Sequence, residues 1–551
     1  MKGQQKELKG IFWILFAVFL IFLLIPFCLL FGKSFWDDGI TGTFYHSVLQ
    51  QKDFFTALCN SFQVAAAAAA TATVLAFLVA YAVHYTLLPS RFKGFLRFVA
   101  TLPMFLPTIT YGFAIIYSFG KQGLLTRILG RQFFDLYGFW GLFLGYVIYT
   151  IPVAFLLLHN TMKFVDKKTF LVSKTMEDRA ISTFWVAVVR PLLGTFAGAF
   201  IQAFFLSFTD FGIPASVGGN YDVIATMLYN QMLGGIPDFH RGAVIAICML
   251  IPSVVSILLL QLLERWNIRY QKISQVELSK NRVRDLGWGL AGLAVAVFLL
   301  SVFAVIFVVP FVEEWPYRTG FSLEHVMEVG SDSELLQVYV HSLLLAAATA
   351  FFGTWLSYGA ALITARSTLG ARYKKVVESL ALMTNAIPGM VLGVAYLFAF
   401  SGTSLQNTFL LMMLCNIVHY FSTPYLMMKN ALSKLNAGWE TTAMLMGDSW
   451  TKTIFRVVTP NALPSLLEVF SYYFINAMVT ISALIFIAGA RTMVLTTMMK
   501  QLQYVNRFHE VFVLSLLILA TNLAVKAGLS LLAKHRWNHK KEKREKGRDF
   551  V

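Results

Sequence analysis

Polar residues that stand inside or beside long apolar runs are the first candidates for chemistry in this chain. Asp210 closes an otherwise uncharged run, and Asn60, Asn385 and Asn476 stand in or beside others. Ionisable residues are costly inside a membrane and mostly line interior cavities. The four residues are therefore candidates for lining a passage for a solute. Asp210 could equally cap the following turn, and each asparagine could equally join two helices by a hydrogen bond.

Motifs for covalent or hydrolytic chemistry are missing from the sequence. It contains no HExxH pair, no nucleophile elbow and no paired carboxylates, and its Ser, His and Asp residues suggest no triad. The nearest string to a Walker A motif, at residues 32–34, lacks the preceding glycine. The four cysteines lie in or beside apolar runs without CxxC spacing, as buried hydrophobic residues do. We expect no catalytic site, no cofactor and no bound metal.

The elements that must position the polar residues are membrane-spanning helices. Of the 551 residues, 57% are hydrophobic and only 13% are charged, whereas a soluble domain carries about 25% charged residues. Apolar runs of about 20 residues recur along the chain, and each can cross a hydrocarbon core about 30 Å thick. The first run exceeds the length of a signal-peptide core and is interpreted as a retained helix. We expect about twelve spans, near residues 11–32, 60–85, 96–119, 136–158, 192–213, 241–263, 287–312, 338–365, 377–400, 408–428, 466–489 and 510–533.

The distribution of charge predicts which loops lie in the cytoplasm. Basic residues gather at both termini, in the linker 264–286 and in the stretch 161–190, whereas 313–335 is acidic. The positive-inside rule places both termini in the cytoplasm and 313–335 outside. The loop 120–135 is an exception, because it is basic and yet expected outside. The net charge of +17 follows from this topology and from contact with anionic lipid, and no nucleic-acid motif accompanies it.

An internal repeat organises the chain. Ser61 and Pro107 recur as Ser342 and Pro388, both 281 residues later. Duplicated membrane units usually build their pathway where the copies meet. We therefore predict an all-α, polytopic membrane protein with two parallel six-helix repeats. The repeats are 1–263 and 287–533, with the linker 264–286 between them and a basic cytoplasmic tail at 534–551.

One expected cytoplasmic stretch, Trp439 to Pro460, is amphipathic and punctuated by a glycine. It resembles the EAA loop of ABC importer permeases, with Ala443 at the second alanine, Gly447 at the glycine and Pro460 at the proline. Thr441 stands at the glutamate, and Glu440 falls one residue earlier. The resemblance implies a short coupling helix that docks on an ATPase subunit, with the glycine at a turn. The alternative is an ordinary surface helix between two spans.

The first repeat carries a weaker counterpart between Leu171 and Pro191. Counting back thirteen residues from Pro191 places Asp178 at the glycine and Lys174 at the second alanine, while Leu171 answers to Glu440. The resemblance implies a second ATPase contact whose details differ, because the two halves meet two ATPase protomers from different sides.

The resemblance covers nearly the whole chain. The string from Ser207 to Leu233 is similar to that of fused permeases in the iron(III), thiamine and 2-aminoethylphosphonate importer group. It implies a permease subunit, not an enzyme, in a bacterial inner membrane, which moves iron(III) or a 2-aminoethylphosphonate-like solute into the cytoplasm. The implied partners are two copies of an ABC ATPase subunit, an extracytoplasmic substrate-binding protein and the lipid bilayer, with no nucleic acid.

The alternative function is an ion-gradient-driven secondary transporter with twelve helices. Such a protein needs charged residues inside its spans to bind the ion. Apart from Asp210 and Glu468, both expected near span ends, the predicted spans offer almost none.

Overall fold

The computed structural model describes residues 2–37, 39–132, 134–166, 168–264 and 281–548. Within this part, nine continuous helices are long and apolar enough to cross a membrane, and three pairs of bent helices bring the number to twelve if each pair is one span. All twelve overlap the spans predicted from the sequence. The all-α, polytopic fold is therefore confirmed, and the strands β1–β4 form only two small hairpins.

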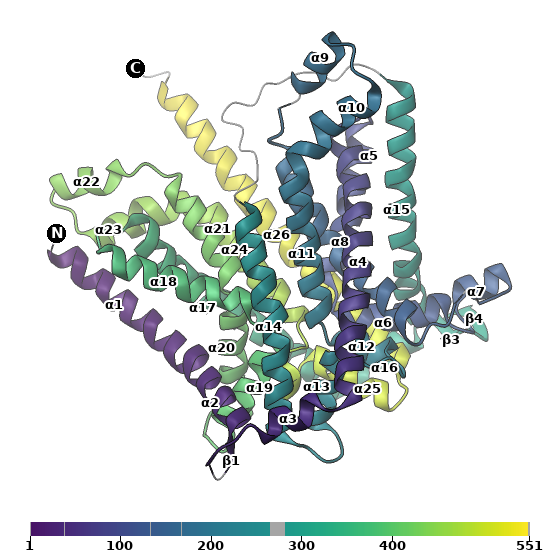
Figure 1. Ribbon diagram of the computed structural model, residues 1–551. Coiled ribbons are helices and arrows are strands. Elements are labelled where there is room, and N and C mark those ends of the chain that lie inside the picture. The colour runs from purple at the N-terminus through teal and green to yellow at the C-terminus, as the bar shows by residue number, and fades with distance from the viewer. Residues whose placement is uncertain (1, 38, 133, 167, 265–280, 549–551) are drawn as a thin grey trace. The chain divides into compact units, whose positions relative to one another are not determined.

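The chain divides into two compact units, of which unit 2 comprises residues 42–329 and 499–516. Its elements are α3 (Thr43–Leu49), α4 (Lys52–His84), α5 (Ser90–Thr101), η2 (Leu102–Phe105), α6 (Thr108–Phe119), α7 (Leu124–Leu129), α8 (Phe139–Met162), α9 (Lys168–Thr175), α10 (Ala180–Phe184), η3 (Trp185–Val189), α11 (Arg190–Thr209), α12 (Gly212–Val217), α13 (Ile224–Leu233), α14 (Phe239–Glu264), α15 (Arg282–Val308), η4 (Val309–Phe311), β3 (Val312–Glu314), β4 (Arg318–Phe321) and α16 (Glu324–Ser331). Helices α4, α8 and α11 pack on one another, and α14 packs on α11 (Figure 1).

Unit 1 comprises residues 1–41, 330–498 and 517–551. Its elements are α1 (Lys2–Phe19), η1 (Leu20–Leu24), α2 (Ile25–Phe35), β1 (Trp36–Asp37), β2 (Gly39–Ile40), α17 (Ser333–Arg366), α18 (Ala371–Met383), η5 (Thr384–Ala386), α19 (Gly389–Phe400), α20 (Phe409–His419), α21 (Ser422–Ser433), α22 (Gly438–Leu445), α23 (Trp450–Thr453), η6 (Ile454–Val458), α24 (Thr459–Val479), η7 (Leu484–Phe486) and η8 (Ala490–Thr492). Helices α25 (Leu495–Tyr504) and α26 (Phe508–Arg548) continue from one unit into the other. Helix α17 packs on α20, α21 and α24.

The repeat seen in the sequence is visible in matching hydrogen bonds. In unit 2 the backbone nitrogen of Ile224 donates to Ser61 Oγ at 2.8 Å, and in unit 1 that of Leu495 donates to Ser342 Oγ at the same distance. Pro107 and Pro388 both stand where a span breaks, at bends of 110° and 108°. Proline favours this break because it disfavours helical backbone in the residue before it.

The first helix of each repeat packs with helices of the other repeat. Helices α1 and α2 belong to the first repeat, yet they pack on α17, α18 and α19 in unit 1. Helix α15 belongs to the second repeat, yet it packs on α4, α5 and α6 in unit 2. The sequence repeats and the compact units therefore divide the chain differently. Most of the linker, 265–280, lies outside the described residues.

Two expected spans are placed too late along the chain. The apolar helices that overlap them run from Ala180 to Thr209 and from Trp450 to Val479, so each begins within a coupling-loop stretch and ends before the predicted span does. In the second case the backbone becomes extended at Thr480, with φ −72° and ψ 136°, which ends α24. The apolar residues after it form short 3₁₀ turns, η7 and η8. Glu468 consequently lies well inside its span and not near the end.

Candidate functional site

The coupling loop of the second repeat, residues 439–460, begins with α22. This helix ends in a Schellman motif. Gly447 has a φ of +78°, the left-handed conformation that a helix C-terminus often needs. The nitrogen of Asp448 donates to the carbonyl of Ala443 at 2.9 Å, and that of Gly447 to the carbonyl of Met444 at 3.1 Å. An added Cβ at Gly447 would meet no atom within 4 Å. The glycine is therefore required by its backbone conformation and not by a lack of room for a side chain.

Glu440 lies in the first turn of α22 and is bound by Arg366, the last residue of α17. The Arg366 guanidinium donates to both carboxylate oxygens, at 2.7 and 2.5 Å. It also donates to the carbonyls of Leu435 and Asn436, each at 2.8 Å. The two charged side chains are 3% and 15% exposed. Glu440 therefore fixes the loop to its own span.

The end of α22 presents apolar side chains to the outside. Leu445 and Met446 are 82% and 79% exposed, and they directly precede Gly447. Thr441, at the family's glutamate position, is also exposed. An exposed apolar projection of this kind is typical of a surface that a partner covers.

Proline follows a widened helical turn in both coupling loops. Five-residue π-helical turns, η3 and η6, directly precede the helices that contain Pro191 and Pro460 at their first turns. Proline cannot donate a backbone hydrogen bond, and a π-turn shifts the pairing so that the helix continues. The predicted prolines thus mark a local bend in long spans.

The coupling loop of the first repeat, residues 171–191, has the same backbone turn in a register that differs by one residue. Its left-handed residue is Glu177, with φ 55°, and the nitrogen of Asp178 donates to the carbonyl of Ser173 at 3.1 Å. The structural counterpart of Gly447 is therefore Glu177, and the alignment of Asp178 with the glycine is corrected. The cause is one extra residue between this turn and Pro191.

Hydrogen bonds between side chains hold the first coupling loop. Ser173 is buried, and its hydroxyl lies 2.5 Å from Asp178 Oδ2 and 2.8 Å from Thr183 Oγ1. Met176, beside the left-handed residue, is largely exposed, as Met446 is in the second loop. The side chains of Leu171 and Lys174 lie outside the described residues.

Asp210 lies between α11 and α12 and caps the second of these helices. Its side chain is buried, and Oδ2 accepts a hydrogen bond from the nitrogen of Ile213 at 2.9 Å. The next glycine, Gly212, packs against the start of α6, where an added Cβ would lie 2.1 Å from Thr108 Oγ1. The carboxylate thus fixes a tight junction between α11, α12 and α6.

The three asparagines predicted for a passage lie in different surroundings. Asn60 Nδ2 donates to the carbonyl of Asp222 at 3.0 Å and so joins α4 to the segment before α13. Asn385 is half-buried at the break before Pro388. Asn476 is half-buried on α24 and donates to the carbonyl of Tyr472 at 2.7 Å. Asn60 belongs to unit 2 with Asp210, and Asn385 and Asn476 belong to unit 1.

Lys500, which the sequence interpretation overlooked, is a buried cation on α25. Its ammonium donates to the carbonyl of Ala215 at 3.0 Å and to Gln503 Oε1 at 2.9 Å. It also lies 4.7 Å from the centre of the Tyr504 ring. Burial lowers the pKa of this ammonium to about 8. The hydrogen bonds join α25 to α12, a few residues beyond Asp210.

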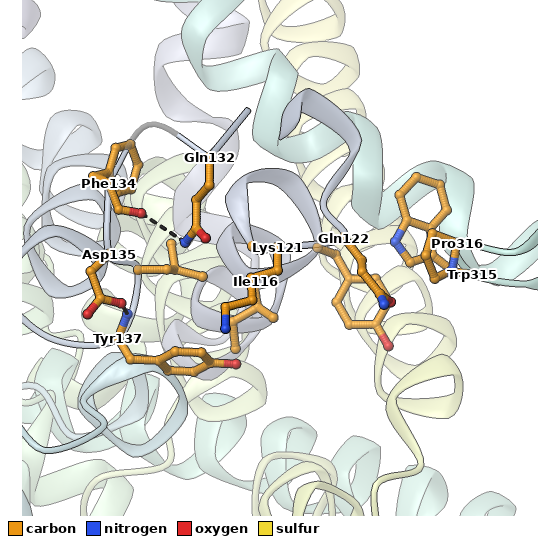
Figure 2. A pocket seen from close by; sticks show the side chains of 12 residues that line it. Ile116, Lys121, Gln122, Gln132, Phe134, Asp135, Tyr137, Trp315 and Pro316 are labelled. Atoms are coloured by element: carbon orange, nitrogen blue, oxygen red, sulfur yellow. Dashed lines mark hydrogen bonds between the residues drawn. The ribbon is translucent and has the colours of Figure 1, made fainter. Parts of the chain in front are cut away.

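An open cavity of about 740 Å³ lies in unit 2 between the loop 120–137 and the hairpin β3–β4. Figure 2 shows Asp135 and Tyr137 on one side of it and Trp315 on the other, with Lys121 and Gln122 between them. Gln122 hydrogen-bonds to the Tyr317 hydroxyl, and Arg127 donates to the carbonyl of Pro316. These contacts tie the two walls together. No sequence pattern indicated this cavity, although the unexplained basic residues of 120–135 lie beside it.

Comparison with known proteins shows what this chain is similar to. Residues 357–537, which include the second coupling loop, match the family described as binding-protein-dependent transport system inner membrane component. FbpB 1 of Haemophilus influenzae, named as a ferric transport system permease protein, is 25% identical over 516 residues, which cover 90% of this chain and 80% of that protein.

Two further relatives extend the comparison. The ferric transport system permease protein FbpB of Actinobacillus pleuropneumoniae is 24% identical over 90% of this chain and 74% of its own length. The molybdenum transport system permease protein ModB of Azotobacter vinelandii is 30% identical over 134 residues, or 24% of this chain and 59% of its own. Residues 357–537 therefore match the inner membrane component family, and 90% of the chain is similar to proteins named as ferric transport system permeases.

Proposed function

We propose that this chain forms the complete translocation pore of an ATP-driven importer for ferric iron. The observation that carries the choice of solute is that relatives named for ferric transport align with 90% of the chain, through both repeats. The 2-aminoethylphosphonate-like solute suggested by the sequence has no comparable support. The ion-driven alternative is disfavoured because the family couples transport to a binding protein.

In this proposal two copies of an ATPase subunit contact the two coupling loops. The support is that each loop ends a helix with a left-handed residue, Gly447 or Glu177, beside exposed apolar side chains. The second loop is fixed to its span by the Arg366–Glu440 ion pair, and the first by the hydrogen bonds of Ser173. Closure of the ATPases would therefore be transmitted through two mechanically different contacts. Both termini lie on the same cytoplasmic side as these loops.

The extracytoplasmic binding protein docks, in this proposal, over the cavity beside Lys121. Helix α15 starts near Leu87, whose nitrogen donates to Asp285 at 3.1 Å, and its other end leads into the hairpin that walls the cavity. The cavity and the basic linker before α15 are thus at opposite ends of a membrane span. Within the described residues, the Lys121 ammonium makes no ion pair. A cation among Tyr117, Tyr137 and Trp315 suits an acidic, protruding loop of a partner, because interface centres are rich in aromatic residues.

Uptake by the reconstituted complex tests the proposed function. The permease is placed in proteoliposomes with its ATPase and with the binding protein that most strongly stimulates ATP hydrolysis. Radioactive iron(III) citrate and labelled 2-aminoethylphosphonate are then supplied separately, with and without ATP. We expect ATP-dependent accumulation of iron alone. Accumulation of the phosphonate alone would replace the solute, and uptake driven by an ion gradient without ATP would replace the mechanism.

A further inference from the structure

Helix α24 presents a polar stripe along one face of a membrane span. Its members recur at spacings of three or four residues, which places them on one side of a helix. They are Asn461, Ser465, Glu468, Tyr472 and Asn476. Glu468 is exposed, and the other four are half-buried. The stripe runs through the span Trp450–Val479 for most of its length.

The other two faces of α24 contact the protein interior and, as their composition suggests, the lipid. Leu466, Val469 and Tyr473 are buried, and the Tyr473 hydroxyl lies 2.9 Å from Ser357 Oγ on α17. The half-buried apolar residues lie on the side roughly opposite the stripe and suit contact with lipid. They are Leu463, Leu467 and Phe470. The polar stripe is therefore a separate face that is too polar for lipid, and one of its members, Tyr472, packs in unit 1 against Tyr420.

The charge of Glu468 indicates whether this face contacts water or lipid. Within the described residues, its carboxylate makes no ion pair and no hydrogen bond. A carboxylate inside a span costs at least about 2.5 kcal/mol in lipid, and such residues almost always face a bundle interior or a water-filled cavity. Exposure of Glu468 in the middle of the span thus indicates water on this side of α24.

The first repeat has no comparable stripe. Counted from the proline that follows the π-turn, the equivalent face of α11 carries small or apolar residues. They are Leu192, Phe196, Ala199, Ala203 and Ser207. Four of these five are buried. The polar face is consequently a specific property of α24 and not a by-product of the repeated fold.

We propose that this face of α24 lines the passage and that Glu468, with Asn476 two turns further along the helix, is a transit site for a hard metal cation. Carboxylate, amide and hydroxyl oxygens are hard donors, which hard cations prefer. The Asn476 nitrogen is used by its own helix, so its oxygen is the atom available to a passing ion. A single carboxylate attracts a cation without binding it too tightly to leave, as conduction requires. It repels an anion such as a phosphonate.

This inference rests on the proposed ferric function and deepens it. The first experiment tests which face of α24 meets water. Single cysteines are placed at 465, 468 and 476 on the stripe and at 463, 467 and 470 on the apolar face, with the native cysteines replaced. A charged, membrane-impermeant thiol reagent should modify the stripe positions at least about tenfold faster, since only water-facing thiols ionise. Equal modification of both faces, or modification of the apolar face alone, would overturn the passage.

The second experiment tests the charge. Glu468→Gln keeps the shape and removes the charge, Glu468→Asp keeps the charge, and Glu334→Gln alters an exposed carboxylate at the start of α17 as a matched control. In proteoliposomes we expect Glu468→Gln to lower uptake of radioactive iron(III) about tenfold or more, with stimulated ATP hydrolysis retained, and Glu468→Asp to recover part of it. The control should match the unmodified protein.

The outcomes separate the two proposals. Full iron uptake by Glu468→Gln would overturn the transit site and leave the ferric importer standing. An unmodified complex that carries no iron would overturn the ferric assignment and the transit site together. Equal loss of protein from the membrane in the Gln and Asp variants would show that Glu468 acts only in folding.

Discussion

The guanidinium of Arg366 and the carboxylate of Glu440 form a two-pronged ion pair between the end of a membrane span and the start of the second coupling loop. The two residues are 74 positions apart in the sequence and meet at 2.7 and 2.5 Å. Because Arg366 also binds the carbonyls before α22, it fixes the angle at which the loop leaves the span. The pair is nearly buried, so water screens it little.

Loss of either member should loosen the loop and separate ATP hydrolysis from transport. We expect Glu440→Gln and Arg366→Met each to destabilise the loop by about 2–3 kcal/mol, since each leaves a partner unsatisfied. Stimulated ATP hydrolysis should persist while uptake falls. The double variant should be no worse than Arg366→Met alone. A loss of uptake in the double variant equal to the sum of the two single losses would show that the residues act independently.

Gly447 should tolerate only residues that accept left-handed backbone. Gly447→Val places a β-branched residue at a φ of +78° and should cost about 1–2 kcal/mol or more, although no atom blocks its side chain. Gly447→Asn should be nearly neutral, because asparagine adopts this conformation readily. The measurement is uptake together with stimulated ATP hydrolysis. If the two variants behave alike, the turn is not rigid in the working complex.

The exposed apolar tips should be needed for contact with the ATPase. Leu445→Ser should weaken co-purification of the ATPase with the permease about tenfold, because a buried leucine contributes about 1.5–3 kcal/mol at an interface. Met176→Ser in the first loop should have a smaller effect, since Met176 stands between the polar residues Thr175 and Glu177, whereas Leu445 stands between two methionines. Val283→Ser alters an equally exposed apolar residue outside both loops and serves as the control. A loss in the control equal to that of Leu445→Ser would contradict a specific contact.

Asp210 offers a way to separate capping from a role in the passage. Asparagine can accept the hydrogen bond from Ile213, whereas alanine cannot. Asp210→Ala should therefore destabilise the junction by about 1 kcal/mol, and Asp210→Asn should leave the amount of protein in the membrane unchanged. If the charge itself serves transport, Asp210→Asn lowers uptake. Uptake equal to that of the unmodified protein would restrict this residue to capping.

Charge reversal at the cavity tests where the binding protein docks. Lys121→Glu should raise the concentration of binding protein needed for half-maximal ATP hydrolysis about tenfold, with the maximal rate retained. Lys52→Glu reverses an exposed cation at the start of α4, away from the cavity lining, and should change little. An unchanged titration in Lys121→Glu would place the docking surface elsewhere.

Much of the architecture could be predicted because it depends on short-range chemistry. The length of an apolar run predicts a membrane span, and a proline predicts where the span bends, as at Pro107 and Pro388. The span ends near Thr209 and Val479 could not be predicted so well. The residues beyond them are as apolar as the helix, and only their backbone conformation shows that they turn back.

The contacts of the candidate site were harder to predict because they depend on residues far apart in sequence. Arg366 was visible only as one more basic residue at a cytoplasmic turn, and nothing in the sequence paired it with Glu440. The register of the first coupling loop was missed by one residue because Glu177 adopts a conformation that usually favours glycine. The spacing of the stripe around Glu468 was visible, but the predicted span 466–489 placed Glu468 near its start, whereas the helix begins well before it.

The first helix of each repeat packs on helices of the other repeat, and this arrangement imposes an order on the assembly of the protein during its synthesis. Helices α1 and α2 leave the ribosome first, yet the helices on which they pack begin at Ser333. At a synthesis rate of about 5–20 residues per second, the first span waits roughly 15–60 s for its partners. It is the most apolar of the nine continuous spans in the described part of the chain, so lipid is a good solvent for it during this interval. Helix α15 inserts after α4, α5 and α6 and can dock at once, so residues 42–329 of unit 2 can assemble while only residues 1–41 of unit 1 have been made.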